Sequence, residues 1–120
     1  MSTHKKLIVW QKAHELAIAV YRITEAFPRH EQFGITSQLR RATLSIPTNI
    51  VEGYSRESNK EFIRFIDIAR GSLAEAQYLL EFAKEIGYST TDITPVENLT
   101  HEVGKLLWSF QQNLKNKSVH

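Results

Sequence analysis

Apolar residues recur at helical spacing in four consecutive parts of the chain, and no part alternates with the period of a β-strand over a useful length. The repeats run through residues 13–27, 39–50, 62–83 and 96–114. Only five glycines and three prolines interrupt the 120 residues. Four amphipathic helices bury their apolar faces against one another, so we expect an all-α, antiparallel up-and-down four-helix bundle.

Signals for helix ends lie between these repeats. Phe27-Pro28 ends the first helix, because proline disfavours a helical conformation in the residue before it. Gly87 suits the position just after the third helix. The expected caps are Thr36 for the second helix, Ser58 or Asn59 for the third, and Thr91-Asp92 or Thr94-Pro95 for the fourth.

Pro47 falls inside the second helical repeat. It lacks an N–H and crowds the carbonyl of Thr43, so it either kinks the helix or ends it. Asn49, Ile50 and Glu52 continue the helical pattern beyond the proline. The pattern therefore favours a helix that is kinked at Pro47.

The composition bounds the class of protein. The chain has no cysteine, which excludes disulfide scaffolds, thiolate zinc sites and cysteine nucleophiles and fits a reducing compartment. No run approaches the roughly 18 apolar residues of a membrane span. We expect one cytoplasmic domain over residues 1–120, with an ordered core at about 7–115 and no membrane partner.

The second and third helices carry apolar residues outside their core stripes. A helix in an isolated bundle buries one stripe and solvates the rest, so a second apolar facet favours burial against another copy of the chain. The alternative is that these helices are central in the bundle or covered by loops. The expected interface residues are Leu44 and Val51 in the second helix and Ile68, Leu79 and Phe82 in the third.

Basic residues are concentrated in the second helix and the start of the third, although the formal net charge is only +2. Such groups attract phosphates, and a nearby tyrosine offers a base-stacking face. The alternative is a solvated face with internal ion pairs. The candidate nucleic-acid-binding residues are Arg40, Arg41, Arg56, Lys60, Arg64 and Tyr54.

A group of polar residues in the same two helices predicts a structural network rather than a catalytic cluster. In this network Arg70 or Arg41 is expected to pair with Glu52 or Glu75, while Asn49 supports the backbone around Pro47. The predicted members are Ser45, Asn49, Glu52, Arg70, Ser72 and Glu75.

Motifs for catalysis are missing from the sequence. His14-Glu15 and His101-Glu102 do not extend to H-E-x-x-H, and there are no paired Glu-x-x-His motifs for a di-iron bundle. No glycine loop is suited to cradling a phosphate. We expect no enzyme activity, no catalytic residue, no metal, no cofactor and no small-molecule substrate.

Two strings of residues carry a resemblance to a known family. They are Leu39-Arg40-Arg41-Ala42 with Ser45-Ile46-Pro47-Thr48-Asn49-Ile50-Val51-Glu52-Gly53, and Ala69-Arg70-Gly71-Ser72-Leu73-Ala74-Glu75. With Val9-Trp10-Gln11-Lys12-Ala13 and Phe27-Pro28, they closely resemble the four-helix-bundle proteins encoded in intervening sequences of bacterial large-subunit ribosomal RNA genes. The resemblance covers roughly Leu7 to Leu114, and Val51 stands where the family usually shows alanine.

This resemblance implies a short up-and-down bundle, often assembled as a ring-like homo-oligomer and commonly as a pentamer. The accessory proteins of diversity-generating retroelements look like relatives, and those act with a reverse transcriptase and nucleic acid. Two functions therefore stay open. One is an oligomeric RNA-associating module with a basic surface, and the other is a homo-oligomeric protein-interaction scaffold that binds no nucleic acid.

Overall fold

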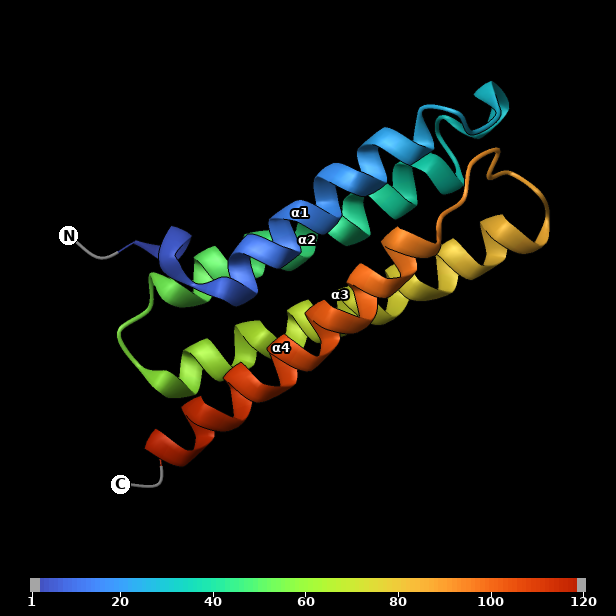
Figure 1. Cartoon of the computed structure of the whole chain (residues 1–120). Helices are drawn as coiled ribbons and strands as arrows, with labels where there is room; N and C mark the ends of the chain where they lie inside the picture. The colour runs from blue at the N-terminus through green and yellow to red at the C-terminus, as the bar shows by residue number, and fades with distance from the viewer. Residues whose placement is uncertain (1–2, 119–120) are drawn as a thin grey trace.

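The computed structural model describes residues 3–118, and within that range the chain is helical and has no strand. Two short 3-10 helices, η1 (His4–Lys6) and η2 (Arg29–Glu31), precede the first and second long helices. The long helices are α1 (Ile8–Thr24), α2 (Ile35–Tyr54), α3 (Asn59–Glu85) and α4 (Thr94–Ser118) (Figure 1).

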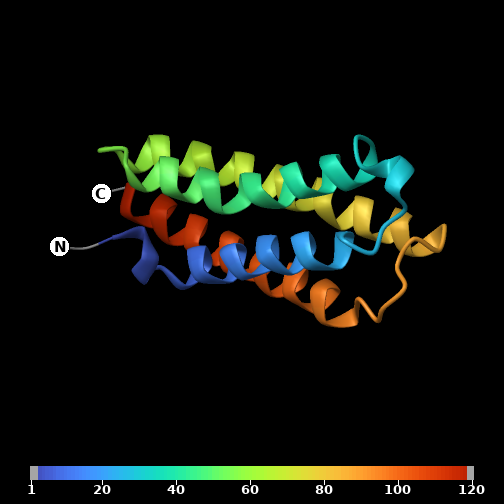
Figure 2. The same cartoon turned by 90° about the horizontal axis from the view of Figure 1, so that it is seen from above.

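Successive helices run in opposite directions along one elongated bundle (Figures 1 and 2). The bundle measures about 50 × 22 × 21 Å. Both termini and the α2–α3 connection lie at one end, here called the terminal end, and the other two connections lie at the far end. The predicted antiparallel up-and-down four-helix bundle is confirmed.

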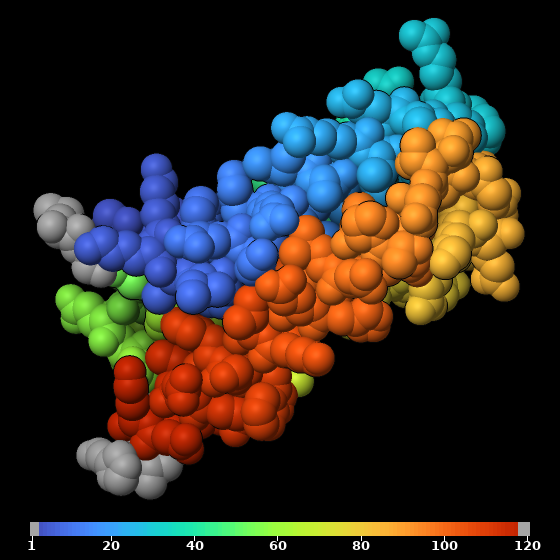
Figure 3. Space-filling view, in the orientation of Figure 1, coloured from blue at the N-terminus to red at the C-terminus, as the bar shows by residue number. Residues whose placement is uncertain are grey.

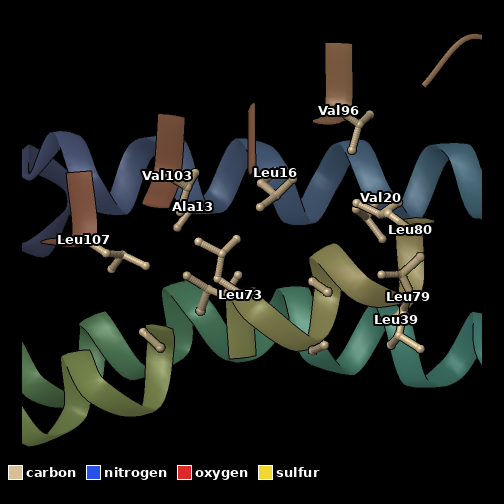
Figure 4. Packing of buried hydrophobic residues seen from close by; sticks show 14 of the residues in the cluster. Ala13, Leu16, Val20, Leu39, Leu73, Leu79, Leu80, Val96, Val103 and Leu107 are labelled. Carbon is tan, nitrogen blue, oxygen red and sulfur yellow. The ribbon is translucent and has the colours of Figure 1, made fainter. Parts of the chain in front are cut away.

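Every long helix contributes to one apolar core (Figure 4). Each buried leucine or valine removed from water stabilises the fold by about 1.5–3 kcal/mol. The central side chains are at most 5% exposed: Leu16 and Val20 from α1, Leu39 from α2, Leu73 and Leu80 from α3, and Val103 and Leu107 from α4.

Leu79 corrects one of the sequence predictions. It was expected on an outward facet of α3, but it is only 7% exposed and belongs to the core. The reason is that Leu79 lies three residues after the buried Ala76 and four before the buried Ala83, so it belongs to the stripe of α3 that faces the core. Leu79 therefore lies outside any surface that a second chain could cover.

Both ends of α3 agree with the helix-end signals predicted from the sequence. Ser58 Oγ accepts a hydrogen bond from the Glu61 N–H at 3.1 Å and caps α3 as expected. Gly87 has a φ of +80°, which favours glycine, and ends α3 as expected. The Tyr88 N–H donates to the Ala83 carbonyl at 2.9 Å, which is the bond of a Schellman ending.

The start of α2 differs from its prediction. Gly34, not Thr36, is the N-cap residue, and Thr36 lies inside the first turn. Because glycine has no side chain to cap with, Glu31 takes over part of that role, and its Oε1 accepts from the Ile35 N–H at 3.4 Å. A Cβ on Gly34 would overlap this Glu31 oxygen, so a side chain at this position would displace the Glu31 carboxylate.

Helix α2 continues through Pro47, which excludes the alternative that the proline ends the helix. The Asn49 side chain donates to the Ser45 carbonyl at 2.8 Å, so it does bind backbone next to the proline, as expected. The kink itself stays a prediction.

Gln111 ties α4 to α3 from a fully buried position. Its Oε1 accepts from Arg70 Nη1 at 2.9 Å, and its Nε2 donates to the Ile63 carbonyl at 3.2 Å and to Asp67 Oδ1 at 2.6 Å. Both ends of the amide are therefore bonded, which is the condition under which a buried polar group is tolerated.

Glu31 joins the α1–α2 connection to the end of α3. The Tyr88 hydroxyl donates to its Oε2 at 2.7 Å. This bond and that from the Ile35 N–H lower the pKa of the Glu31 carboxyl. The same Tyr88–Glu31 bond raises the pKa of the Tyr88 phenol.

Replacing Gln111 with methionine should lower the free energy of unfolding by about 1–3 kcal/mol, because Arg70 and Asp67 lose their shared partner. Urea denaturation measures the change. Gln112→Met, one position along α4 at a partly exposed site, is the matched control and should have little effect. Equal losses in the two variants would contradict the role of the Gln111 amide.

Replacing Glu31 with glutamine should lower the Tm at neutral pH, because the carboxylate is the stronger acceptor for Tyr88. A carboxyl whose pKa is lowered by folding stabilises the protein above its ordinary pKa of about 4.3, and this gain is lost as the pH falls through the folded value. The Tm difference between variant and parent should therefore shrink in acid. Circular dichroism measures it, with the exposed Glu57→Gln as control, and a difference that persists in strong acid would be inconsistent with this account.

Candidate functional site

Two arginines at the terminal end share one aromatic ring. The Cζ atoms of Arg56 and Arg64 lie 5.0 and 4.9 Å from the centroid of Phe65. Phe65 is 9% exposed and packs beside Gly53, where a Cβ would overlap the ring of Phe62. The buried ring therefore contacts two guanidinium groups at the surface and favours their positions over it, each by roughly 0.5–1 kcal/mol.

Other charged residues come from η1, the start of α3 and the end of α4, which lie at the same end (Figure 1). Lys60 is exposed and one helical turn before Arg64, so the two side chains share a face of α3. Arg56 also bonds Glu52 at 3.5 Å, but both side chains are about half exposed, so this pair is weak. Lys5, Lys6, Arg56, Lys60, Arg64, Lys115 and Lys117 lie at this end, together with Glu52, Glu57, Glu61 and Asp67.

Two of the predicted basic residues lie elsewhere. Arg40 is at the far end, where its Nε donates to Thr24 Oγ1 at 2.8 Å and its Nη2 donates to the Tyr21 carbonyl at 3.1 Å. Helix α2 continues for fourteen positions from Arg40 to its end at Tyr54, a rise of about 21 Å, and Arg56 lies beyond that end. Arg41 directly follows Arg40 on α2 and is exposed. The prediction of one basic cluster was therefore wrong, and three of the five cations come together.

Tyr54 is half-buried at the terminal end. Its ring meets those of Phe62 and His4 at steep angles, with centroids 6.4 Å apart in both pairs. It is therefore part of the aromatic packing that closes this end, and only part of the ring is exposed for stacking.

The predicted polar network divides into separate groups. Ser45 and Ser72 bond through their hydroxyls at 2.8 Å, and Asn49 Nδ2 donates to Ser45 Oγ at 2.9 Å. These three residues join α2 to α3, as a structural network should.

The charged members of that network take other partners than those expected. Glu75 accepts from Gln38 at 3.1 Å, while Glu52 pairs with Arg56 and Arg70 with Gln111. The expected pairing of Arg70 or Arg41 with Glu52 or Glu75 was wrong. Helical spacing gave no information about which turn of α4 would meet Arg70.

A polar groove of about 330 Å³ lies on the α2–α3 surface. It is lined by Gln38, Arg41, Ala42, Ser45, Ser72 and Glu75. The groove therefore collects residues from both strings that the sequence singled out.

Apolar side chains are exposed on α2 and α3. Leu44 is 47% exposed, Ile68 is 43% and Phe82 is 42%, whereas Val51 is half-buried. Tyr78, which the sequence reading did not single out, is 63% exposed and packs its ring against Phe82 with centroids 6.3 Å apart. The spacing of four residues between them was the available signal.

The face shown in Figure 3 is formed largely by α1 and α4, which lie side by side. A hollow of about 300 Å³ lies between them. Lys12 at its edge bonds Glu102 at 3.4 Å and Glu15 at 3.5 Å, and these two carboxylates raise the pKa of the Lys12 amine.

Residues 3–118 contain no group of three or more His, Cys, Asp or Glu side chains placed to hold a metal ion. In the same part of the chain, no helix has the length and apolar character needed to span a membrane.

Comparison with known proteins agrees with the motifs. The family described as 23S rRNA-intervening sequence protein matches residues 5–109. The chain is also similar to the crystal structure of a protein with unknown function from the S23 ribosomal protein family of Bacteroides thetaiotaomicron VPI-5482. Identity is 28%, 87% of this chain and 98% of that chain are covered, and the TM-score is 0.77. No curated protein matches. With most of its length matched, the chain belongs to the 23S rRNA-intervening sequence protein family.

Proposed function

We propose that this chain is a non-enzymatic, oligomeric module of the cytoplasm that associates with RNA through its terminal end. The observation that carries the proposal is the pair of guanidinium groups that Phe65 holds at that end. Arg56, Lys60 and Arg64 form the centre of the contact.

Positioned guanidinium groups suit a phosphodiester backbone. Arginine binds phosphate oxygens through paired N–H donors, and a side chain that is already ordered loses less entropy when it binds. The weak pairing of Arg56 with Glu52 leaves that arginine available to a stronger acceptor. The exposed part of Tyr54 is a secondary contact at the same end, and Arg41, farther along α2, contacts only an RNA that extends along this helix.

RNA is favoured over other polyanions by the names of the family and of the similar structure that the chain matches. The matched family is named for 23S rRNA, and the similar Bacteroides protein comes from a family named for a ribosomal protein. Several basic ends in one oligomer would add their weak contacts by avidity.

A second candidate is a homo-oligomeric scaffold that binds no nucleic acid. The exposed Leu44, Ile68 and Phe82 favour it, because apolar side chains on α2 and α3 gain stability when another copy covers them. Val51 adds to this surface, whereas Leu79 does not. The resemblance makes a pentamer the expected assembly, and the basic residues would then only keep it soluble.

Neutralising Arg56 and Arg64 together by glutamine should weaken RNA binding and make it less sensitive to salt. Each lost phosphate contact on a single strand reduces the slope of log K against log [salt] by about 0.7. Fluorescence anisotropy with a labelled RNA, measured over a salt series, gives the slope.

The matched control is Arg22→Gln with Lys105→Gln, which removes the same charge at exposed positions away from the terminal end. It should leave the slope unchanged. Equal losses in both pairs would show a general charge effect, and no RNA binding by the parent at physiological salt would favour the scaffold.

Placing a glutamate at Phe82 should dissociate the oligomer, because the charge would be buried without a partner. Light-scattering mass measures the number of subunits. Trp108→Glu, at a position in α4 that is 55% exposed, is the control and should leave the mass unchanged. A parent protein that is already a monomer would refute the assembly on these facets.

A further inference from the structure

A cavity of about 160 Å³ opens at the far end of the bundle, where α1 gives way to η2 and α2. This corner cavity lies away from the cations of the terminal end. Its polar lining comes from Thr24, Glu25, Arg29, Gln32, Thr36 and Arg40.

Thr36 lines this cavity, and its side-chain hydroxyl lacks a hydrogen-bond partner among residues 3–118. The residue is 6% exposed, and its Oγ1 has no hydrogen-bond partner in the described part of the chain. A buried hydroxyl without a partner costs free energy, so Thr36 calls for a partner from outside the chain, either water or the polar atom of a ligand. The buried hydroxyls of Thr24 and Thr43 donate to backbone carbonyls, whereas Ser89 Oγ, like Thr36 Oγ1, has no partner in the described part of the chain.

The first turn of α2 adds donors beside Thr36. The first backbone bond of this helix runs from the Gln38 N–H to the Gly34 carbonyl, so the N–H groups of Thr36 and Ser37 precede it. Gly34 provides no side-chain cap, and the first turn holds no acidic residue. The partial positive charge of this 20-residue helix is therefore offset only by the long bond from Ile35 to Glu31.

Arg40 lines the cavity, and its guanidinium is held by three contacts. Thr24 Oγ1 and the Tyr21 carbonyl accept from its guanidinium, and its Cζ lies 4.8 Å from the centroid of the Tyr21 ring. Arg29 supplies a second cation at the exposed side, and Glu25 is the acidic residue in the lining. Within the lining the two arginines outweigh that one carboxylate, and the Glu31 carboxylate lies at the start of α2 outside the lining.

We propose that the corner cavity binds a phosphate group. The volume corresponds to about five waters, enough for a phosphate and some of its hydration. The phosphate accepts from the Thr36 hydroxyl, which turns toward it, from the first-turn N–H groups and from the two arginines. The group comes either from free phosphate or from the 5′ end of an RNA.

Calorimetric titration with inorganic phosphate, against sodium chloride of equal ionic strength, tests the site. Thr36→Val and Arg29→Gln should each weaken binding about tenfold or more, because each removes a donor to a charged group. Glu25→Gln should strengthen it by removing the opposing charge. Arg22→Gln removes an exposed cation of α1 outside the lining and should change nothing.

Stability separates a lost ligand from a damaged fold. In chloride, Thr36→Val should unfold at the same temperature as the parent or higher, because the unpaired hydroxyl is gone. At a phosphate concentration ten times the parent's Kd, the parent's unfolding constant should fall about elevenfold, and that of the variant should fall by about twofold or less.

Two short RNAs that differ only in a 5′-phosphate or a 5′-hydroxyl distinguish the sources. If the parent prefers the 5′-phosphorylated RNA and Thr36→Val loses this preference, the site binds an RNA end. If the parent binds the two RNAs equally but still binds inorganic phosphate, the site binds the free ion. No phosphate binding by the parent, or unchanged binding by Thr36→Val, would overturn the proposal. Neither result depends on Arg56 and Arg64, so it stands or fails separately from the proposed function.

Discussion

The close approach of α2 and α3 at Gly53 is the constraint on which the candidate site depends. Because a Cβ at this position would overlap the Phe62 ring, only glycine allows the two helices to meet here with Phe62 and Phe65 between them. Phe65 is thereby fixed, and its ring favours the positions of the two guanidinium groups that lie over it. A packing detail of the core thus sets the geometry of charges at the surface.

The fold gives the two ends of the bundle different chemistry. Up-and-down connectivity brings both termini and the α2–α3 connection together, and each carries lysine or arginine. The far end gathers the start of α2 and the end of α1, where Arg40 is used to satisfy the Thr24 hydroxyl and the Tyr21 carbonyl. Arg40 and Arg56 therefore lie at opposite ends of the bundle, although only sixteen positions separate them in the sequence.

The sequence could predict what depends on one helix at a time. Periodicity predicted the four helices, and local chemistry predicted the Ser58 cap and the Gly87 ending, because these depend on neighbouring residues alone. It misplaced Leu79, at the edge of the buried arc of α3, because the width of that arc depends on how α2 and α4 pack against the helix. It likewise missed that Arg70 pairs with Gln111, since that contact depends on the register between α3 and α4. No local signal could have revealed the unpartnered hydroxyl of Thr36.

The two proposed functions depend on different surfaces of an elongated molecule. Leu44, Ile68 and Phe82 lie along the sides of α2 and α3, whereas Arg56 and Lys60 lie at the end of the bundle. Subunits that associate through their sides in a ring would all point their terminal ends along one axis. Their basic residues would then form a single rim, whose field acts on one polyanion rather than on several. Self-association would in that case strengthen RNA binding rather than compete with it.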